Sequence, residues 1–339
     1  MKQRHKITIL TLLALPLILG FTKWEKREKD PFITARAMPF VYPSLNGEPK
    51  FSSQFHFNHI NRGTVLNNYR GAGVTVAIID SGLNTTHEDF LDGATTNISN
   101  KSAYVEETGT YYSNIQIQSV EEHGRSIIED THPEAAGHGT NVASTVGAMV
   151  NGVGTAGISA NVTLLVLKTN YMFTEINAAI RYAADNGADI INMSLGAYEE
   201  SFIDGHGKQQ NGIEGASTYF QTAINYAYNK GVTVIAAAGN EKTDHYSYPA
   251  SNNNVIGVGA LGRNTSTTIA SYSNFGLHNV DIVSPGSVYV ADIGGVSAYT
   301  ETQGTSFAAP IVASAAAIYK GKYPTATPAK IEQRLKETA

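Results

Sequence analysis

The chain has 339 residues, of which 42% are hydrophobic and 16% are charged, and its net charge is −5 at pH 7. This composition allows a substantial buried core, which excludes disorder throughout, and the absence of a long basic run beyond the N-terminus gives no indication of nucleic-acid binding. The chain has no cysteine, which excludes disulfides, thiolate metal sites and a cysteine nucleophile.

The N-terminus has the pattern of an export signal. Basic residues at positions 2, 4 and 6 precede a mostly apolar run over residues 7–21. A run of about 15 residues is short for a membrane-spanning helix, which needs about 20. We predict that residues 1–21 are a cleaved signal peptide, and the alternative is an N-terminal anchor that associates with the membrane. The protein is then secreted or held at the cell surface.

Residues 22–50 are first charged and then punctuated by prolines. This pattern predicts a linker or a short pro-segment. The folded domain is therefore expected to span residues 51–339.

After residue 50, short apolar runs alternate with amphipathic stretches. Strands are predicted over residues 74–79, 162–167, 190–194, 232–238, 255–260 and 280–284, and helices over 174–186, 216–230 and from Pro328 onward. The alternation predicts an α/β fold of three layers, in which a doubly wound, mostly parallel sheet is covered by helices on both faces. Residues 92–136 and 197–215 are polar and irregular, and we expect surface insertions there.

Three polar residues stand where such a fold presents functional groups. Asp80 ends the first strand, His138 precedes a helix of small residues, and Ser306 opens the stretch SFAAPIVASAAAI. In a parallel α/β sheet, ligand-binding groups gather beyond the carboxyl ends of the strands. Each residue alone is explained as well by an ordinary cap or turn. Together, in this order and each close to a glycine, they match one of the known chain orders of a catalytic Asp-His-Ser triad.

Five sequence blocks around these residues resemble those of the subtilisin-like serine peptidases, the subtilase family. The blocks are DSGLNTTHEDF, GHGTNVAS, NMSLG, AAAGNE and GTSFAAP. The resemblance implies the subtilisin-like fold and a serine endopeptidase that hydrolyses polypeptides through an acyl-enzyme intermediate. We expect it to act as a monomer.

The resemblance implies a role for each residue of the site. Ser306 is the nucleophile, His138 is the base that takes its proton, and Asp80 orients the imidazole and stabilises the imidazolium. Asn240 and the backbone N–H of Ser306, near a helix N-terminus, are implied to donate hydrogen bonds to the oxyanion.

Two residues near the nucleophile are unusual for a helix. Gly304 allows the backbone to turn tightly before Ser306. Pro310 lacks the N–H that would donate to the carbonyl of Ser306, four residues earlier. The sequence therefore predicts a perturbed helix beside the nucleophile.

Substrate binding is implied by the same resemblance. One segment is implied to pair with an extended substrate, and a second to form the opposite wall of the pocket for the residue before the cut. These residues are Ser194, Leu195 and Gly196 in the first segment, and Ala237, Ala238 and Gly239 in the second. Glu241 and Asp244 either favour a basic substrate residue in this pocket or are ordinary solvated surface charges.

The resemblance also implies a structural calcium site. Oxygen atoms from a carboxylate, an amide and several carbonyls suit calcium, and the alternative is a plain glycine-rich turn. The implied ligands are Asp89, Met149, Asn151, Val153 and Thr155. His87, which also matches a family position, is expected to be structural.

The pattern of segments favours a dedicated processing enzyme over a scavenger. Only about 30 residues separate the apolar run from residue 51, too few for a typical independent folding domain, and the insertions are sizeable. Enzymes that remove leaders from bacterial peptides fit this description. Two other classes stay open: a catalytically inactive binding protein on the same fold, and a metal-dependent hydrolase. The metal ligands would be His87, Asp89, His123, His132 and His138, whose spacing matches no zinc-helix motif.

Overall fold

A computed structural model describes residues 44–339 apart from 61–65, 67–68, 109–113 and 264–266. The predicted signal peptide or anchor and most of the predicted linker lie outside the described residues. Across the described part of the chain, no helix has the length and hydropathy that crossing a membrane requires.

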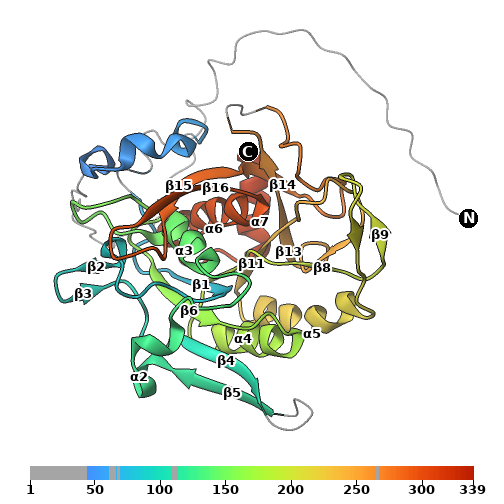
Figure 1. The fold of residues 1–339 in the computed structure, drawn as a ribbon, viewed down its shortest axis with the longest axis horizontal. Helices are drawn as coiled ribbons and strands as arrows, with labels where there is room; N and C mark the ends of the chain where they lie inside the picture. Colours follow the sequence, from blue (N-terminus) through green and yellow to red (C-terminus); the bar gives the residue numbers. More distant parts are fainter. Residues whose placement is uncertain (1–43, 61–65, 67–68, 109–113, 264–266) are drawn as a thin grey trace, which may run out of the picture. The chain divides into compact units, whose positions relative to one another are not determined.

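An eight-stranded sheet forms the centre of the fold (Figure 1). Its strands, in spatial order, are β14 (Ile282–Pro285), β13 (Val255–Leu261), β11 (Thr233–Ala237), β7 (Ile190–Met193), β1 (Thr75–Asp80), β6 (Thr163–Lys168), β4 (Ala103–Thr108) and β5 (Asn114–Ser119). Neighbouring strands are parallel, except that the edge strand β5 runs antiparallel to β4. The strands predicted from apolar runs are confirmed as β1, β6, β7, β11, β13 and β14.

Helices cover both faces of the sheet. They are α3 (His138–Gly147), α6 (Thr305–Lys322) and α7 (Pro328–Thr338) on one face, and α4 (Phe173–Asp185) and α5 (Ala216–Asn229) on the other. Alternate residues of β1 serve the two cores, since Val76 and Ile78 pack with the first set of helices and Ala77 and Ile79 with the second. Burial on both faces explains why the strands are continuous apolar runs. The predicted three-layer α/β fold is confirmed.

Segment 92–136, predicted to be an irregular insertion, instead supplies two strands of the central sheet. β4 pairs with β6 and carries β5 on its outer edge. The prediction was wrong because β4 is buried only at Ala103 and Val105, and β5 is exposed along most of its length. Neither therefore has the apolar run of a central strand.

The described chain packs into the folded unit before residue 51. The short helix η1 (Leu45–Gly47) places Leu45 in the core. The N–H of Lys50 donates to the carbonyl of Gly154 at 2.8 Å. Residues 44–50, expected to belong to a linker, therefore pack against the domain.

Shorter elements complete the described chain. They are η2 (Phe51–Ser53), η3 (Phe55–Asn58), η4 (Glu88–Phe90), β2 (Leu91–Asp92), β3 (Thr95–Thr96), α2 (Val120–His123), η5 (Arg125–Ile128), β8 (Ala197–Tyr198), β9 (Phe202–Ile203), β10 (Gln209–Gln210), β12 (Ser247–Tyr248), β15 (Ser287–Ala291) and β16 (Tyr299–Gln303). The predicted insertion 197–215 thus carries β8, β9 and β10.

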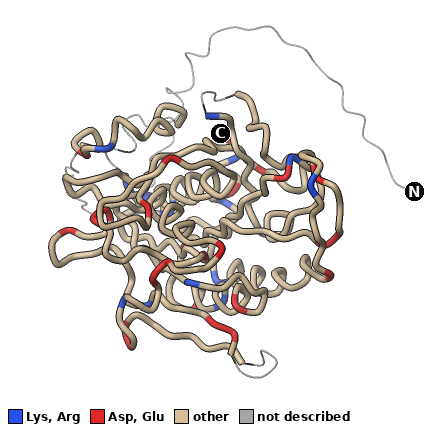
Figure 2. The backbone as a smooth tube through the Cα atoms, in the orientation of Figure 1, with Lys and Arg blue, Asp and Glu red and all other residues tan. Residues whose placement is uncertain are grey.

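Figure 2 marks the positions of the charged residues along the backbone, which are scattered over the described chain. The central strands β7, β11 and β13 carry none. Asp80 at the end of β1 is an exception, and it is fully buried. A buried carboxylate is costly unless it is hydrogen-bonded or paired, so the surroundings of Asp80 lead to the candidate site.

Candidate active site

The order of connections places a crevice at the carboxyl end of β1. The chain passes from β1 through α3 to β6 on one side, and from β6 through α4 to β7 on the other. The helices α3 and α4 lie on opposite faces of the sheet. Where neighbouring connections cross opposite faces of a parallel sheet, a crevice for a ligand forms beyond the carboxyl ends of the strands. Asp80 ends β1 at this point.

Buried Asp80 and half-buried His138 form a pair. The Oδ1 atom of Asp80 accepts hydrogen bonds of 2.8 Å from the N–H of Ser81, from Nδ1 of His138 and from the hydroxyl of Tyr171. Because a carboxylate only accepts, Nδ1 of His138 carries a proton and Nε2 is left with its lone pair. This is the tautomer that a general base for a serine hydroxyl needs.

Glycine brings His138 close to Asp80. A Cβ atom on Gly139 would lie 2.2 Å from the carbonyl oxygen of Gly82. Only a residue without a side chain therefore lets the start of α3 pack on the turn after β1. The N–H of Gly139 also donates to Oγ of Ser81 at 2.8 Å, which fixes the helix to that turn.

The acidic surroundings of His138 favour its charged form. Burial lowers the pKa of His138, but the charge and hydrogen bond of Asp80 and the charge of Asp130 outweigh burial and hold this pKa above its usual value. Asp130 is held in place by Thr140, whose N–H and hydroxyl donate to Oδ2 at 2.9 and 2.7 Å. The imidazole is thus suited to accept and keep a proton.

Ser306 lies in the first turn of α6, which packs against α3. The rings of His138 and Phe307 have centroids 5.7 Å apart, so the imidazole lies next to the residue that follows Ser306. The hydroxyl of Ser306 donates to the carbonyl of Ser194 at 3.3 Å, and no hydrogen bond joins it to His138 within the described chain. Rotation about χ1 redirects such a hydroxyl, and catalytic hydrogen bonds often tighten only when substrate binds.

The perturbation predicted for α6 is present. Pro310 lies inside the helix, and the carbonyl of Ser306 that it leaves without a helical donor accepts from the hydroxyl of Ser194 at 2.7 Å. Gly304, just before the helix, has a φ of 155°. Asn192 in turn donates to the hydroxyl of Ser194 at 3.0 Å. The backbone of Ser306 is therefore fixed to the end of β7.

Two N–H donors lie at the start of α6. The Oδ1 atom of Asn240 accepts from the N–H and the hydroxyl of Thr305 at 2.9 and 3.1 Å. Nδ2 of Asn240 has no hydrogen-bond acceptor among the described residues. The N–H of Ser306 lies in the first helical turn, where no carbonyl four residues earlier is available.

The two predicted walls of the substrate pocket leave the sheet side by side. Met193 of β7 lies opposite Ala236 of β11, so the segments 194–196 and 237–239 that follow these residues are neighbours. The N–H of Gly239 donates to Oγ1 of Thr305 at 3.1 Å. The second segment is thereby tied to the start of α6.

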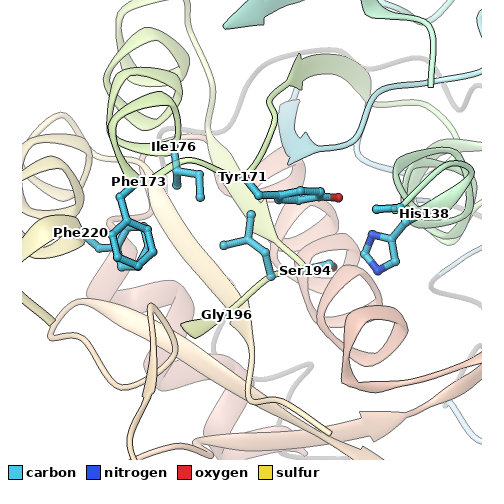
Figure 3. A pocket seen from close by; sticks show the side chains of 9 residues that line it. His138, Tyr171, Phe173, Ile176, Ser194, Gly196 and Phe220 are labelled. Carbon is cyan, nitrogen blue, oxygen red and sulfur yellow. The ribbon is translucent and has the colours of Figure 1, made fainter. Parts of the chain in front are cut away.

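A cavity of about 290 Å³ opens beside His138 (Figure 3). The residues that line it are Ala135, His138, Tyr171, Phe173, Ile176, Ser194, Leu195, Gly196 and Phe220. The sequence predicted His138 and the segment 194–196 as site residues and gave no indication of Ala135, Tyr171, Phe173, Ile176 and Phe220. The last three lie on α4 and α5, where an apolar residue has the spacing of an ordinary core position, so the sequence carried no separate signal for them.

The two acids considered for a basic substrate residue lie elsewhere. Glu241 holds the turn around Asn240, since its Oε2 accepts from the hydroxyl of Tyr198, from the N–H of Asn240 at 2.6 Å and from Nδ2 of Asn274 at 3.1 Å. Asp244 lines a separate cavity of about 360 Å³. The other residues of that cavity are Tyr198, Glu199, Glu200, His245, Tyr246 and Tyr248.

The loop predicted to bind calcium wraps around Asp89, but protein groups fill its centre. Oδ1 of Asp89 accepts from the N–H of Thr155 at 3.2 Å and from the hydroxyl of Tyr299 at 2.7 Å, and Oδ2 accepts from the hydroxyl of Thr155. The carbonyl of Asp89 accepts from the N–H of Met149 at 2.7 Å. A Cβ atom on Gly154 would lie 1.9 Å from Oδ1 of Asp89 and from the hydroxyl oxygen of Tyr299. That hydroxyl therefore lies inside the loop.

The remaining predicted ligands also bond to protein. Asn151 donates to two backbone carbonyls at 2.9 and 2.7 Å, and its Oδ1 accepts from the N–H of Val153 at 3.3 Å. Glu48 approaches the loop, accepting from the N–H of Gly152 at 3.1 Å. The described residues contain no group of three or more His, Cys, Asp or Glu side chains that could hold a metal. In this arrangement, protein groups bind the carboxylate of Asp89 and the side chain of Asn151.

His87 is structural, as predicted. Its Nε2 donates to the carbonyl of Ala298 at 2.8 Å, and its Nδ1 accepts from the N–H of Asp89 at 3.1 Å. His123 lies on the exposed helix α2, with its Nδ1 3.3 Å from the carbonyl of Ser119. The histidines considered for a metal-dependent hydrolase therefore do not form one site.

Comparison with known proteins identifies the family. Residues 71–339 match the Subtilase family. Subtilisin DY of Bacillus licheniformis is 32% identical over 281 residues, which cover 80% of this chain and 85% of that protein. Of subtilisin E of Bacillus subtilis, which is also 32% identical over 281 residues, the chain covers 61%.

Solved structures give the same result. Proteases from Pseudoalteromonas arctica PAMC 21717 have a TM-score of 0.68 at 29% identity, over 87% of this chain and 93% of that chain. The nisin leader peptidase NisP from Lactococcus lactis shares the fold, with a TM-score of 0.64 at 22% identity over 84% of this chain and 88% of that one. The chain belongs to the subtilase family of subtilisin-like serine endopeptidases.

Proposed function

We propose that this endopeptidase acts through Ser306 as nucleophile, His138 as general base and acid, and Asp80 as the group that orients and stabilises the imidazolium. The observation that carries the proposal is the 2.8 Å bond from Nδ1 of His138 to the fully buried carboxylate of Asp80. This bond lies at the carboxyl end of β1, and α6, which carries Ser306 in its first turn, packs nearby.

The proposed reaction begins when the hydroxyl of Ser306 turns from the Ser194 carbonyl to Nε2 of His138. Its oxygen forms a bond to the carbonyl carbon of the peptide while its proton passes to Nε2. The C–N bond then breaks, and the imidazolium gives the same proton to the leaving amine. Water repeats the sequence: it loses a proton to Nε2, attacks the acyl-enzyme and releases the acid, and Ser306 regains its proton.

The negative oxygen of the tetrahedral intermediate needs donors in the crevice. We propose Nδ2 of Asn240 and the N–H of Ser306 for this role. The orientation of Asn240, set by its bonds to Thr305, supports it. We expect Asn240→Ala to lower kcat about 10²–10³-fold, because donors that act on the transition state contribute mainly to kcat.

The proposed substrate is an extended polypeptide that lies along segments 194–196 and 237–239. The cavity next to His138 ends in Phe173, Ile176 and Phe220 (Figure 3). The aromatic and aliphatic side chains that line the cavity favour an apolar side chain on the substrate residue that occupies it. This preference follows from the lining of the cavity and needs no acidic side chain.

Product mapping tests the nucleophile and the specificity together. Mass spectrometry of a diverse peptide library treated with wild type is expected to show cuts with an apolar residue at one upstream position. Ser306→Ala is expected to lose activity on the order of 10⁴-fold or more. A fluorophosphonate probe is expected to label wild type at Ser306 in the presence of EDTA. Full activity of Ser306→Ala would overturn the proposal.

We also propose that the enzyme is exported and removes leader segments from a small set of substrates. The proposal of export rests on the basic and apolar pattern of residues 1–21. The processing role is supported by segment 197–215, which directly follows the proposed substrate strand and pairs with the chain beyond Asn240 through β8 and β12. Digestion of unfolded casein tests it: a few product sites are expected, and cleavage at many sites would contradict it.

For Asp89 we propose stabilisation by protein donors in place of the calcium ion that the sequence predicts. The hydroxyls of Tyr299 and Thr155 supply these donors. No catalytic step depends on this loop.

A further inference from the structure

The carboxylate of Asp80 receives one donor that an Asp-His-Ser triad does not require, the hydroxyl of Tyr171. It donates to Oδ1 at 2.8 Å, the same length as the bond from Nδ1 of His138 to that oxygen. The N–H of Ser81 makes the third bond, also at 2.8 Å. Oδ2, which is buried, has no hydrogen-bond partner within the described chain. Three donors therefore share the lone pairs of one buried oxygen.

The backbone that carries Tyr171 is tied to the same aspartate. The N–H of Thr169 donates to the main-chain carbonyl of Asp80 at 2.9 Å, and the N–H of Tyr171 donates to Oγ1 of Thr169 at 3.3 Å. Tyr171 has a φ of 62°, in the left-handed region that bulky residues rarely adopt. Such strain persists only where surrounding contacts hold it, and it is typical of functional sites. The turn between β6 and α4 thus directs this side chain to Asp80.

The ring of Tyr171 also forms a wall of the substrate cavity. In Figure 3 it lies between His138 and the apolar end with Phe173 and Ile176, and its hydroxyl points toward the His138 side. The ring of His132 packs against it, with centroids 5.0 Å apart at a steep angle. One side chain therefore borders the space for substrate and contacts the carboxylate of the proposed triad.

We propose that Tyr171 is a positioning residue, which fixes the Asp80 oxygen that binds His138 and weakens the hold of that oxygen on the imidazolium proton. This inference rests on the proposed function of Asp80 and His138. A hydroxyl that donates to a carboxylate disperses part of its negative charge. The carboxylate still selects the tautomer of His138, and the imidazolium then releases its proton more readily to the leaving amine.

The groups around His138 set the direction of the pH effect. The titratable groups that face it are Asp80, Asp130, Tyr171 and, behind Tyr171, His132. Burial and the charge of Asp80 raise the pKa of Tyr171 far above its usual value, so its hydroxyl remains a donor at neutral and alkaline pH. Without this donor, Asp80 carries more charge on the shared oxygen. The pKa of His138 then rises.

Tyr171→Phe tests the proposal because it keeps the ring and removes only the hydroxyl. We expect kcat to fall about three- to tenfold, the range of one hydrogen bond, with KM changed by less than about twofold. The acid limb of the pH profile of kcat/KM is expected to move up by about half a pH unit. Tyr182→Phe is the matched control, since the hydroxyl of Tyr182 donates to the carbonyl of Lys101 at 2.9 Å on an exposed side of α4.

The double variant separates this inference from the proposed function. In the Asp80→Asn background, Tyr171→Phe is expected to cause no further loss of kcat, since the charged oxygen is gone. An unchanged kcat and pH profile in Tyr171→Phe, or a change confined to KM, would overturn the role of Tyr171 alone. Full activity of Asp80→Asn and of Ser306→Ala would instead overturn the proposed function.

A spectroscopic measurement on the wild-type chain does not depend on any variant folding. The hydroxyl proton of Tyr171 and the Nδ1 proton of His138 both point at Oδ1 of Asp80. Proton NMR should therefore show a nuclear Overhauser effect between them. A spectrum with a resolved Nδ1 proton and no such effect would contradict the proposal.

Discussion

The hydroxyl of Ser194 donates a hydrogen bond to a carbonyl of α6 that has no donor within the helix. Pro310 cannot donate to the carbonyl of Ser306, and Ser194 does so at 2.7 Å. A serine in the proposed substrate strand therefore also supports the backbone of the proposed nucleophile. Its two roles separate in experiment, because stability reports the backbone contact and kinetics report substrate binding.

Ser194→Ala is expected to lower the free energy of unfolding by about 1 kcal/mol, the usual worth of a hydrogen bond. Pro310→Ala restores an N–H that can donate to the carbonyl of Ser306. The double variant is therefore expected to recover stability, with a coupling of about 0.5–1 kcal/mol in a double-mutant cycle measured by urea unfolding. Strictly additive effects of the two substitutions would show that the carbonyl does not couple them.

The pKa of His138 predicts a second outcome at the residue scale. The proposed general base His138 must be neutral, so kcat/KM is expected to rise with pH through a pKa that lies above the usual value for histidine. Asp130→Asn removes one of the charges that raise this pKa. The acid limb of the pH profile is then expected to move to lower pH, opposite to the shift in Tyr171→Phe.

Kinetics with a peptide substrate between pH 5 and 9 measure this shift. Glu134→Gln, at an exposed acid close to His138 in sequence, is the control and is expected to leave the profile in place. The sign for stability is opposite to that for activity. Because the folded pKa is raised, charged His138 stabilises the fold below the unfolded pKa, and this contribution is lost as pH rises through the folded pKa. If Asp130→Asn leaves the pH profile unchanged, the charge of Asp130 does not raise the pKa of His138.

Candidate residues could be predicted from the sequence where chemistry requires one residue type in a fixed local pattern. Asp80, His138 and Ser306 stand at strand and helix ends marked by glycines, and these ends converge in the structure. Tyr171 could not be predicted, since its approach to Asp80 depends on a left-handed backbone turn and on the register of β6 beside β1. A tyrosine carries no local sign of such a turn.

At the scale of elements, the loop around Asp89 shows a contact that the sequence does not predict. The calcium ligands were implied by the family resemblance, and the loop that carries them does wrap around Asp89. Tyr299 comes from β16, more than 200 residues away in the chain, and no local pattern predicts its hydroxyl inside the loop. A residue that is distant in the sequence, Tyr299, therefore supplies a donor to Asp89 inside the loop.

Tyr299→Phe is expected to destabilise the fold by about 1–3 kcal/mol, because buried Asp89 loses a donor that satisfies its charge. EDTA is expected to leave the melting temperature of wild type unchanged, since protein groups already bind both oxygens of Asp89. Tyr289→Phe is the matched control: its ring stacks on Tyr299 with centroids 6.1 Å apart, and no hydrogen bond of its hydroxyl is seen in the described chain. A melting temperature of wild type that falls sharply with EDTA would restore the calcium site.

Some strands could be predicted from their local sequence, and others form only because they pair with a distant strand. Strands buried on both faces were predicted, because every residue of β11 and β13 is buried and the sequence is a continuous apolar run. β4 and β5 were missed because their pairing, and not their composition, makes them strands. Two isoleucines of β5, Ile115 and Ile117, are partly exposed, at 39% and 37%, as expected of an edge.

At the scale of the whole molecule, residues 44–50 decide where the folded unit begins. They were expected to be part of a linker because segment 22–50 is charged and punctuated by prolines, and Leu45 alone gave little reason to expect burial. In the structure Leu45 is only 5% exposed and belongs to the same core cluster as α3, α6 and α7. The core of the peptidase therefore includes a segment whose composition predicts a linker.

Leu45→Ala in the full chain tests this directly. A large-to-small change in a packed core costs about 2–5 kcal/mol, from lost burial and from the cavity left behind. Leu277→Ala is the matched control, because Leu277 is 99% exposed and surface changes usually stay within about 0.5 kcal/mol. Urea unfolding of the two variants is expected to show a lower midpoint for Leu45→Ala alone. Equal midpoints would mean that residues 44–50 act as a linker, and the boundary predicted at residue 51 would then hold.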